Sequence, residues 1–103
     1  MAIGSEAIGA AYSTVVGVTA KATNQYASAF GYSAEASGDY ATSLGMQSKA
    51  SGTSSIAIGR SSKATNDNAI AIGNGASATD ERAVAIGYES DATAIGSQSI
   101  GLR

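Results

Sequence analysis

Few residues of this chain are of types that could perform catalysis, and their spacing completes no catalytic pattern. The chain has no Cys and no His, which removes thiolate nucleophiles, disulfides, Ser-His-Asp triads and most zinc sites. No lysine stands three residues after a serine, so the S-x-x-K arrangement of Ser-Lys catalysis is missing. Gly73-Asn74-Gly75 resembles part of a nucleotide-binding loop, but the rest of a G-x-G-x-x-G pattern is missing. We therefore expect no enzymatic activity and no cofactor.

Several acidic and amide side chains could in principle bind calcium, namely Asn66, Asp67, Asp80, Glu81 and Asp91. Calcium-binding solenoids repeat the pattern Gly-Gly-x-Gly-x-Asp, which does not occur here. The acids also do not recur at one position in every coil. We interpret them as solvated turn residues and expect no metal site.

The charge of the chain argues against nucleic acid as a partner. Its six Lys and Arg residues are scattered, the net charge is −2 and the isoelectric point is about 4.8. No basic stripe could neutralise phosphates. No stretch approaches the roughly 18 consecutive apolar residues of a membrane span, and the N-terminal residues resemble no signal peptide. We expect no direct membrane insertion by this segment.

The composition also limits the elements that could position any site. Ala, Ser, Gly and Thr make up 59 of the 103 residues, whereas Ile, Val, Leu, Met and Phe together number only 18. A compact monomer of this length normally buries many large apolar side chains around one core. Three possibilities follow: disorder, a repeat structure with a thin core, or burial of the apolar residues against copies of the same chain.

A strict 14-residue repeat argues against disorder. Glycine stands at positions 17, 31, 45, 59, 73, 87 and 101. Five residues after each of the first six, the residue is always alanine: Ala22, Ala36, Ala50, Ala64, Ala78 and Ala92. The residues before each glycine alternate between small and large, as in Ala69-Ile70-Ala71-Ile72-Gly73. Such a period of two predicts a β-strand with two distinct faces.

Each repeat is therefore predicted to hold two strands of about five residues, separated by turns such as residues 65–68 and 79–82. Stacked repeats would pair each strand with its equivalent in the next coil, giving parallel ladders about 4.8 Å apart. We predict an all-β parallel β-roll, or solenoid, that forms a single domain over residues 1–103. It would contain about seven coils, with atypical capping coils at residues 1–16 and 93–103, and be roughly 35 Å long.

The interior of this roll is predicted to be lined by Ala, Ser and Gly only, so that its two sheets lie unusually close. A Val or Phe pointing inwards would push the sheets apart, because a packed interior responds to added volume. The large residues would then form an apolar stripe on one outer face, which usually marks an interface. The predicted interface residues are Ile56, Ile58, Ile70, Ile72, Val84, Ile86, Leu44 and Phe30. The alternative is the reverse orientation, in which the isoleucines form the core.

Rotational symmetry would let each roll bury this stripe against its neighbours. A homotrimer is a natural solution, although the residue arithmetic leaves a dimer open.

Two exposed columns suggest a binding role. The residue after each glycine varies, and Tyr32, Met46, Arg60 and Tyr88 in this column form a candidate ligand surface, because Tyr and Arg are enriched at binding hot spots. Alternatively, these residues stabilise contacts between coils. A hydroxyl column six residues after each glycine would suit an ice-binding solenoid; it consists of Thr23, Ser37, Ser51, Thr65, Thr79 and Thr93.

The recurring Ala-Ile-Ala-Ile-Gly-x-x-Ser-x-Ala pattern resembles the head repeat of the trimeric autotransporter adhesins, the YadA-like heads. The residues that carry the resemblance lie in three consecutive repeats, at 56–64, 70–78 and 84–92. The resemblance implies a left-handed parallel β-roll, packed as a homotrimer with the Val and Ile positions at its centre. It also implies a cell-surface or extracellular protein, displayed on the outer membrane, that binds host extracellular-matrix or cell-surface molecules. Similar repeats occur in phage tail fibres and extracellular filaments, which leaves a structural or receptor-binding segment of a virion fibre as the alternative.

Overall fold

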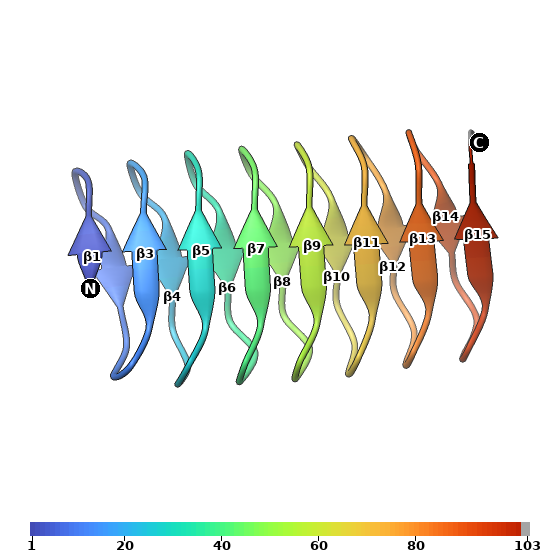
Figure 1. The fold of residues 1–103 in the computed structure, drawn as a ribbon, viewed down its shortest axis with the longest axis horizontal. Coiled ribbons are helices and arrows are strands. Elements are labelled where there is room, and N and C mark those ends of the chain that lie inside the picture. The colour runs from blue at the N-terminus through green and yellow to red at the C-terminus, as the bar shows by residue number, and fades with distance from the viewer. Residues whose placement is uncertain (102–103) are drawn as a thin grey trace.

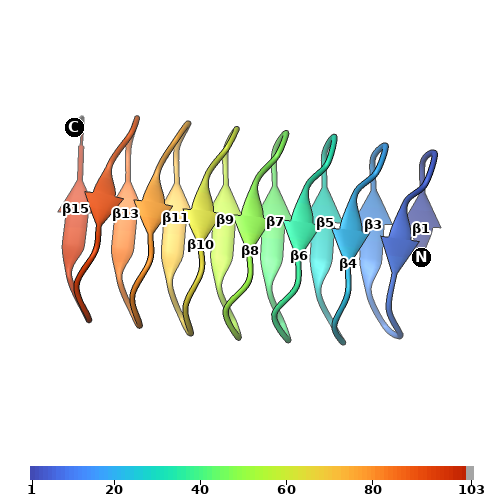
Figure 2. The same ribbon diagram turned by 180° about the vertical axis from the view of Figure 1, so that it is seen from behind.

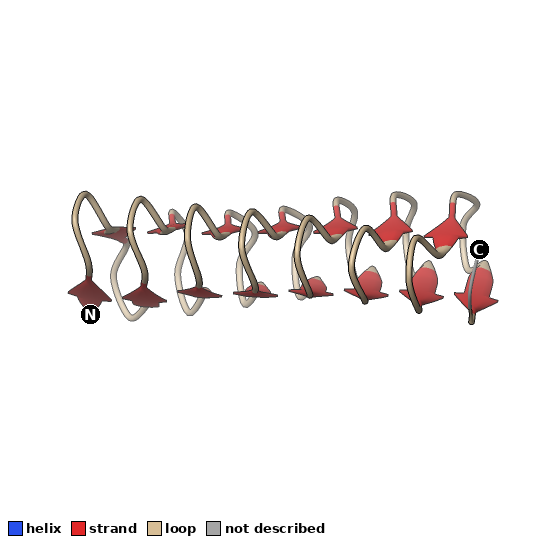
Figure 3. Cartoon of the chain, turned by 90° about the horizontal axis from the view of Figure 1, so that it is seen from above, coloured by secondary structure: helices blue, strands red, loops and turns tan. Residues whose placement is uncertain are grey.

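Each 14-residue repeat folds into one coil of a parallel β-solenoid, and each coil contributes one strand to each of two facing sheets (Figure 3). The structure is a computed structural model and describes residues 1–101. Leu102 and Arg103, the end of the predicted capping coil 93–103, lie outside the described residues. The Cα atoms extend over 35 × 20 × 11 Å, so the molecule is a flat rod.

The larger sheet has eight strands, which follow one another along the rod in chain order (Figure 1). All neighbouring strands are parallel, and the register between the full-length strands is the repeat itself, as in Ile70 beside Ile56 and Val84. The strands are β1 (Ala2–Ile3), β3 (Thr14–Val16), β5 (Ser28–Phe30), β7 (Thr42–Leu44), β9 (Ile56–Ile58), β11 (Ile70–Ile72), β13 (Val84–Ile86) and β15 (Gln98–Ile100).

The smaller sheet has seven strands of two residues each and covers the other side of the rod (Figure 2). Its strands are β2 (Ile8–Gly9), β4 (Lys21–Ala22), β6 (Glu35–Ala36), β8 (Lys49–Ala50), β10 (Lys63–Ala64), β12 (Ser77–Ala78) and β14 (Asp91–Ala92). The predicted strand length of about five residues is therefore wrong for both sheets, because tight turns end every strand after two or three residues. Within residues 1–101 there is no helix long and apolar enough to span a membrane.

The interior consists almost entirely of small side chains, which confirms the predicted orientation of the strands. Seventeen alanines form the buried hydrophobic cluster together with one larger residue, Val15. In β9, β11 and β13 the central alanine is buried, whereas the two flanking large residues are half-buried on the outer side. The reverse orientation, with isoleucine as the core, is excluded.

Val15 contradicts the expectation of an interior lined by Ala, Ser and Gly only, because this side chain is fully buried. The volume of the Val15 side chain is compensated by Gly9, which lies in β2 of the other sheet. The other coils have alanine at the position of Gly9. A Cβ atom on Gly9 would lie 3.3 Å from Cγ2 of Val15 and 2.8 Å from Oγ of Ser13. One large and one very small residue therefore share the space that two alanines fill elsewhere.

Both turns of each coil place a residue at positive φ. In the turn after the large sheet, the Ala20 backbone N–H donates to Gly17 O at 3.3 Å, and the intervening Thr19 has a φ of 56°. In the opposite turn, the Ser13 N–H donates to Ala10 O at 3.2 Å around Tyr12, which has a φ of 61°. A hydrogen bond that closes four residues, with positive φ at the second of the two central residues and not at the first, is the geometry of a type II turn.

The glycine column is required where successive coils stack. Gly59 has a φ of +120°, and a Cβ atom placed on it would lie 2.7 Å from the carbonyl carbon of Gly73 in the next coil. The backbones are too close for any side chain, and the conformation itself is one that L-residues avoid. This double requirement explains why the glycine recurs every 14 residues.

Buried serines mostly bond to backbone carbonyls within the roll. Ser62 Oγ donates to Gly59 O at 2.9 Å, and Ser48 Oγ makes the equivalent bond to Gly45 O. Among the described residues, Ser55 has the only buried side-chain oxygen with no hydrogen-bond partner.

Candidate functional site

The outer side of the larger sheet carries an apolar row that runs the length of the rod. This row is formed by the residue before each glycine: Ile3, Val16, Phe30, Leu44, Ile58, Ile72, Ile86 and Ile100. Consecutive members are direct partners in the parallel ladder. Because parallel neighbours lie about 4.8 Å apart, the side chains form an unbroken ridge. We call it the apolar row.

A second outward column accompanies the apolar row, two residues earlier in each strand. It is apolar only at Ile56, Ile70 and Val84, whereas Thr14, Ser28 and Thr42 occupy it in the coils closer to the N-terminus. We call these last three residues the hydroxyl row. All eight predicted interface residues thus lie on this one face; Phe30 is exposed and the others are half-buried.

The candidate ligand residues lie in the turns just after the larger sheet and are exposed. Tyr32 and Tyr88 are each about half exposed, Met46 is 38% exposed, and Arg60 is also classed as exposed. They share one edge of the rod, but Tyr88 is separated from Arg60 by the coil that contains Asn74. The structure therefore places them in one column without bringing them into one cluster.

Sequence reasoning did not identify a stack of three tyrosines at the opposite turns. The rings of Tyr12 and Tyr26 lie 5.3 Å apart, centre to centre, with an interplanar angle of 10°. Those of Tyr26 and Tyr40 are also 5.3 Å apart, at 4°. The signal that could have revealed this tyrosine ladder is the 14-residue spacing, which places all three at one position of the repeat.

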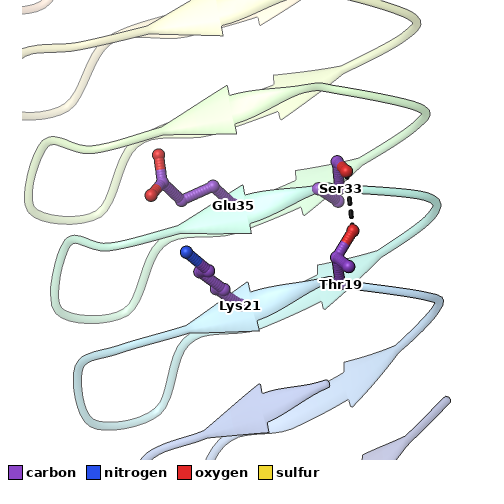
Figure 4. A pocket seen from close by; sticks show the side chains of 5 residues that line it. Thr19, Lys21, Ser33 and Glu35 are labelled. Atoms are coloured by element: carbon purple, nitrogen blue, oxygen red, sulfur yellow. Dashed lines mark hydrogen bonds between the residues drawn. The ribbon is translucent and has the colours of Figure 1, made fainter. Parts of the chain in front are cut away.

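The outer side of the smaller sheet is polar. Lys21, Glu35, Lys49 and Lys63 stand in register there, and Lys49 Nζ lies 3.5 Å from Glu35 Oε1. A depression of about 220 Å³ opens beside Lys21 and Glu35 (Figure 4). At its other side Thr19 Oγ1 and Ser33 Oγ are hydrogen-bonded at 2.7 Å. One amine, one carboxylate and two hydroxyls in an open hollow do not constitute a catalytic arrangement.

The residues that partly resemble a nucleotide-binding loop or a calcium site do not form one cluster in the structure. Gly73-Asn74-Gly75 leads from a strand into a turn, and Gly75 donates its N–H to Arg60 O at 2.9 Å in the coil below. Asp67 Oδ1 accepts a hydrogen bond from the Thr53 backbone N–H at 3.1 Å, so this carboxylate supports the stacking of turns. Across residues 1–101, no three His, Cys, Asp or Glu side chains are grouped to hold a metal ion.

Fold and surface together define a class of protein: a parallel β-solenoid with an alanine interior and one long apolar outer face. Matches to the YadA head domain repeat, in units of two copies, cover residues 9–34, 22–48, 36–62, 50–76 and 64–90. Because these overlapping matches span residues 9–90, the chain belongs to the YadA head domain repeat family. No curated protein matches the chain significantly.

Membership of this family indicates a class of protein. It implies a segment of the trimeric autotransporter adhesin type, exposed at a surface. Proteins of this family are in general not enzymes, which agrees with the dispersed polar groups described above.

Proposed function

We propose that this chain is the head segment of a trimeric surface adhesin, in which three left-handed rolls bury their apolar faces against one another. The observation that carries the proposal is the apolar row, which is register-paired across all eight strands of the larger sheet. A soluble single chain rarely exposes an apolar strip of this length. The interior offers no room for these side chains, so only another surface can cover them.

Parallel packing of identical rolls around one axis suits this row. Each coil would meet the same coil of its neighbours, so that Ile72 packs at the height of Ile72. A cyclic arrangement closes on itself and leaves no apolar strip over. The polar outer side of the smaller sheet, with Lys21, Glu35 and Lys49, would remain in water.

Attachment to host matrix or cell-surface molecules would use the exposed column after each glycine, with Tyr32, Met46, Arg60 and Tyr88. Tyr and Arg combine apolar area with hydrogen-bonding groups, which favours them at the centres of interfaces. A trimer presents three identical columns. Weak individual contacts would then add through multivalency, because the second and third contacts form at high effective concentration.

The assembly can be tested with one charge placed on either side of the same coil. Ile72→Asp places a carboxylate on the apolar row, where desolvation of an unpaired charge costs several kcal/mol per chain. Ser77→Asp places the same charge on the outer side of the smaller sheet, in the column that already contains Asp91. We expect Ile72→Asp to disperse the assembly and Ser77→Asp to leave its mass unchanged. An intact assembly in Ile72→Asp would refute the proposed interface.

The ligand surface can be tested on extracellular matrix deposited by cultured fibroblasts. A variant with Tyr32→Ala, Arg60→Ala and Tyr88→Ala should lose retention on this matrix while keeping its mass and circular dichroism spectrum. The matched control is Lys21→Ala with Lys63→Ala, which removes exposed side chains from the other side of the rod. Equal loss in both variants would argue against the column as the ligand surface.

A further inference from the structure

The tyrosine ladder formed by Tyr12, Tyr26 and Tyr40 is unexpectedly exposed for a stack of aromatic rings. The three side chains are 76%, 49% and 60% exposed. Each also has a φ of 61°, a conformation that costs a bulky L-residue about 1–2 kcal/mol. Equivalent turns use Asn68 and Gly96, which adopt positive φ more readily. Tyrosine is thus retained three times at a position where its backbone preference opposes it.

The ladder is correlated with the hydroxyl row, coil by coil. The three coils with tyrosine in the turn have Thr14, Ser28 and Thr42 two residues later, on the outer face of the larger sheet. In the next three coils the turn residue is Ser54, Asn68 or Arg82, and the residue two later is Ile56, Ile70 or Val84. The last coil has Gly96 and Gln98 and carries neither large group. In six consecutive coils, each coil therefore has one large apolar or aromatic group at one of two positions about 7 Å apart along the chain.

The rings stack on one another and are half to three-quarters exposed in the single chain. They therefore offer a continuous aromatic surface against which another molecule can pack. Within each coil, a large apolar or aromatic residue at one of the two positions accompanies a smaller or polar residue at the other. This pattern requires that the two positions of neighbouring chains meet at the same height along the rod. A parallel assembly of identical chains brings equal coils together, whereas an antiparallel one would place the tyrosine coils opposite coils that contain isoleucine.

We propose that the tyrosine ladder of each chain packs on the hydroxyl row of the neighbouring chain, at the same height in the parallel assembly. The occupant of this surface is a second copy of the chain. The small Thr and Ser side chains leave space beside Val16, Phe30 and Leu44 of the apolar row, and the neighbour's ring fills it. This inference rests on the proposed trimer and adds a specific contact to it, in which one chain supplies the rings and its neighbour the small side chains that accept them.

Cysteine cross-linking tests the contact directly, because the native chain has no cysteine. A tagged chain with Tyr26→Cys would be co-expressed with a differently tagged chain that has Ser28→Cys. A thiol-to-thiol cross-linker about as long as the removed tyrosine ring should give a linked species that contains both tags, because a direct disulfide needs Cα atoms closer than about 7 Å. The control pairs Tyr26→Cys with Ile70→Cys, three coils away or about 14 Å along the rod, and should give no mixed species.

The outcomes separate this inference from the proposed function. Three-chain mass with no mixed species from the first pair would overturn the ladder contact and leave the trimer in place. Single-chain mass of the native protein would overturn both. Nitration by tetranitromethane tests the contact without any cysteine variant. It should be several-fold slower at Tyr12, Tyr26 and Tyr40 of the native protein than in dispersed Ile72→Asp, and equal in both proteins at Tyr32 and Tyr88. Equal nitration of the ladder in both proteins would overturn the inference.

Discussion

The stacking of coils predicts that one added methyl group at Gly59 destabilises the roll severely. In Gly59→Ala, the new Cβ would lie 2.7 Å from the Gly73 carbonyl carbon, 2.8 Å from its oxygen and 3.2 Å from the Asn74 nitrogen. These are backbone atoms of the adjacent coil, so no side chain can move aside. Holding alanine at a φ of +120° costs about 1–3 kcal/mol, and overpacking costs about another 1–3 kcal/mol. The expected loss is therefore about 4 kcal/mol.

Gly96→Ala provides the matched control, because it makes the same substitution in open space. Gly96 has a φ of +68°, and an added Cβ would meet nothing within 4 Å. The expected cost is about 1 kcal/mol from the left-handed conformation, partly offset by reduced freedom of the unfolded chain. Urea unfolding followed by circular dichroism at equal protein concentration would compare the two. Similar midpoints for Gly59→Ala and Gly96→Ala would refute the argument that backbone contact between coils fixes the glycine column.

Further substitutions test the interior, each by the same unfolding measurement. Ser55→Ala should leave stability unchanged or raise it by about 1 kcal/mol, because it removes a buried hydroxyl without a partner. Ser62→Ala should lower stability by about 1 kcal/mol, because it removes the hydrogen bond to Gly59 O. A larger loss of stability in Ser55→Ala than in Ser62→Ala would contradict this reasoning. Gly9→Ala should destabilise by about 1–3 kcal/mol through its contacts with Val15 and Ser13, and adding Val15→Ala should recover part of the loss. No recovery would mean that the two positions do not share one space. Ala78→Phe should prevent folding of the roll, because the fully buried Ala78 lies between sheets of a rod only 11 Å thick; a native circular dichroism spectrum would exclude the thin interior.

The repeat made most of the fold predictable from the sequence. A period of 14 with glycine in one column and alanine in another determines which residues face inwards, because strand side chains alternate between faces. The predicted partners Ile56, Ile70 and Val84 are neighbours in the structure for this reason. The number of coils, multiplied by the spacing of parallel strands, gave the length of the rod, which is 35 Å in the structure.

Features that depend on contacts across the roll were not predictable in the same way. Val15 fits inside the roll because Gly9 of the other sheet lies next to it. The repeat pattern does not reveal this contact. The short length of the strands also lacked a clear signal, because the positive-φ residue inside most of the turns is not glycine; Thr19 and Arg82 are examples. The 14-residue spacing places Tyr12, Tyr26 and Tyr40 in one column, but only the structure shows that their rings are stacked and exposed.

The mass of the native chain in solution, measured by sedimentation equilibrium, tests the central claim most directly. The apolar row, covered by two further copies, predicts a species of three times the 10.1 kDa of one chain. A stable single-chain species of 10.1 kDa would contradict the account, because the apolar row would then lie open to water along the whole rod.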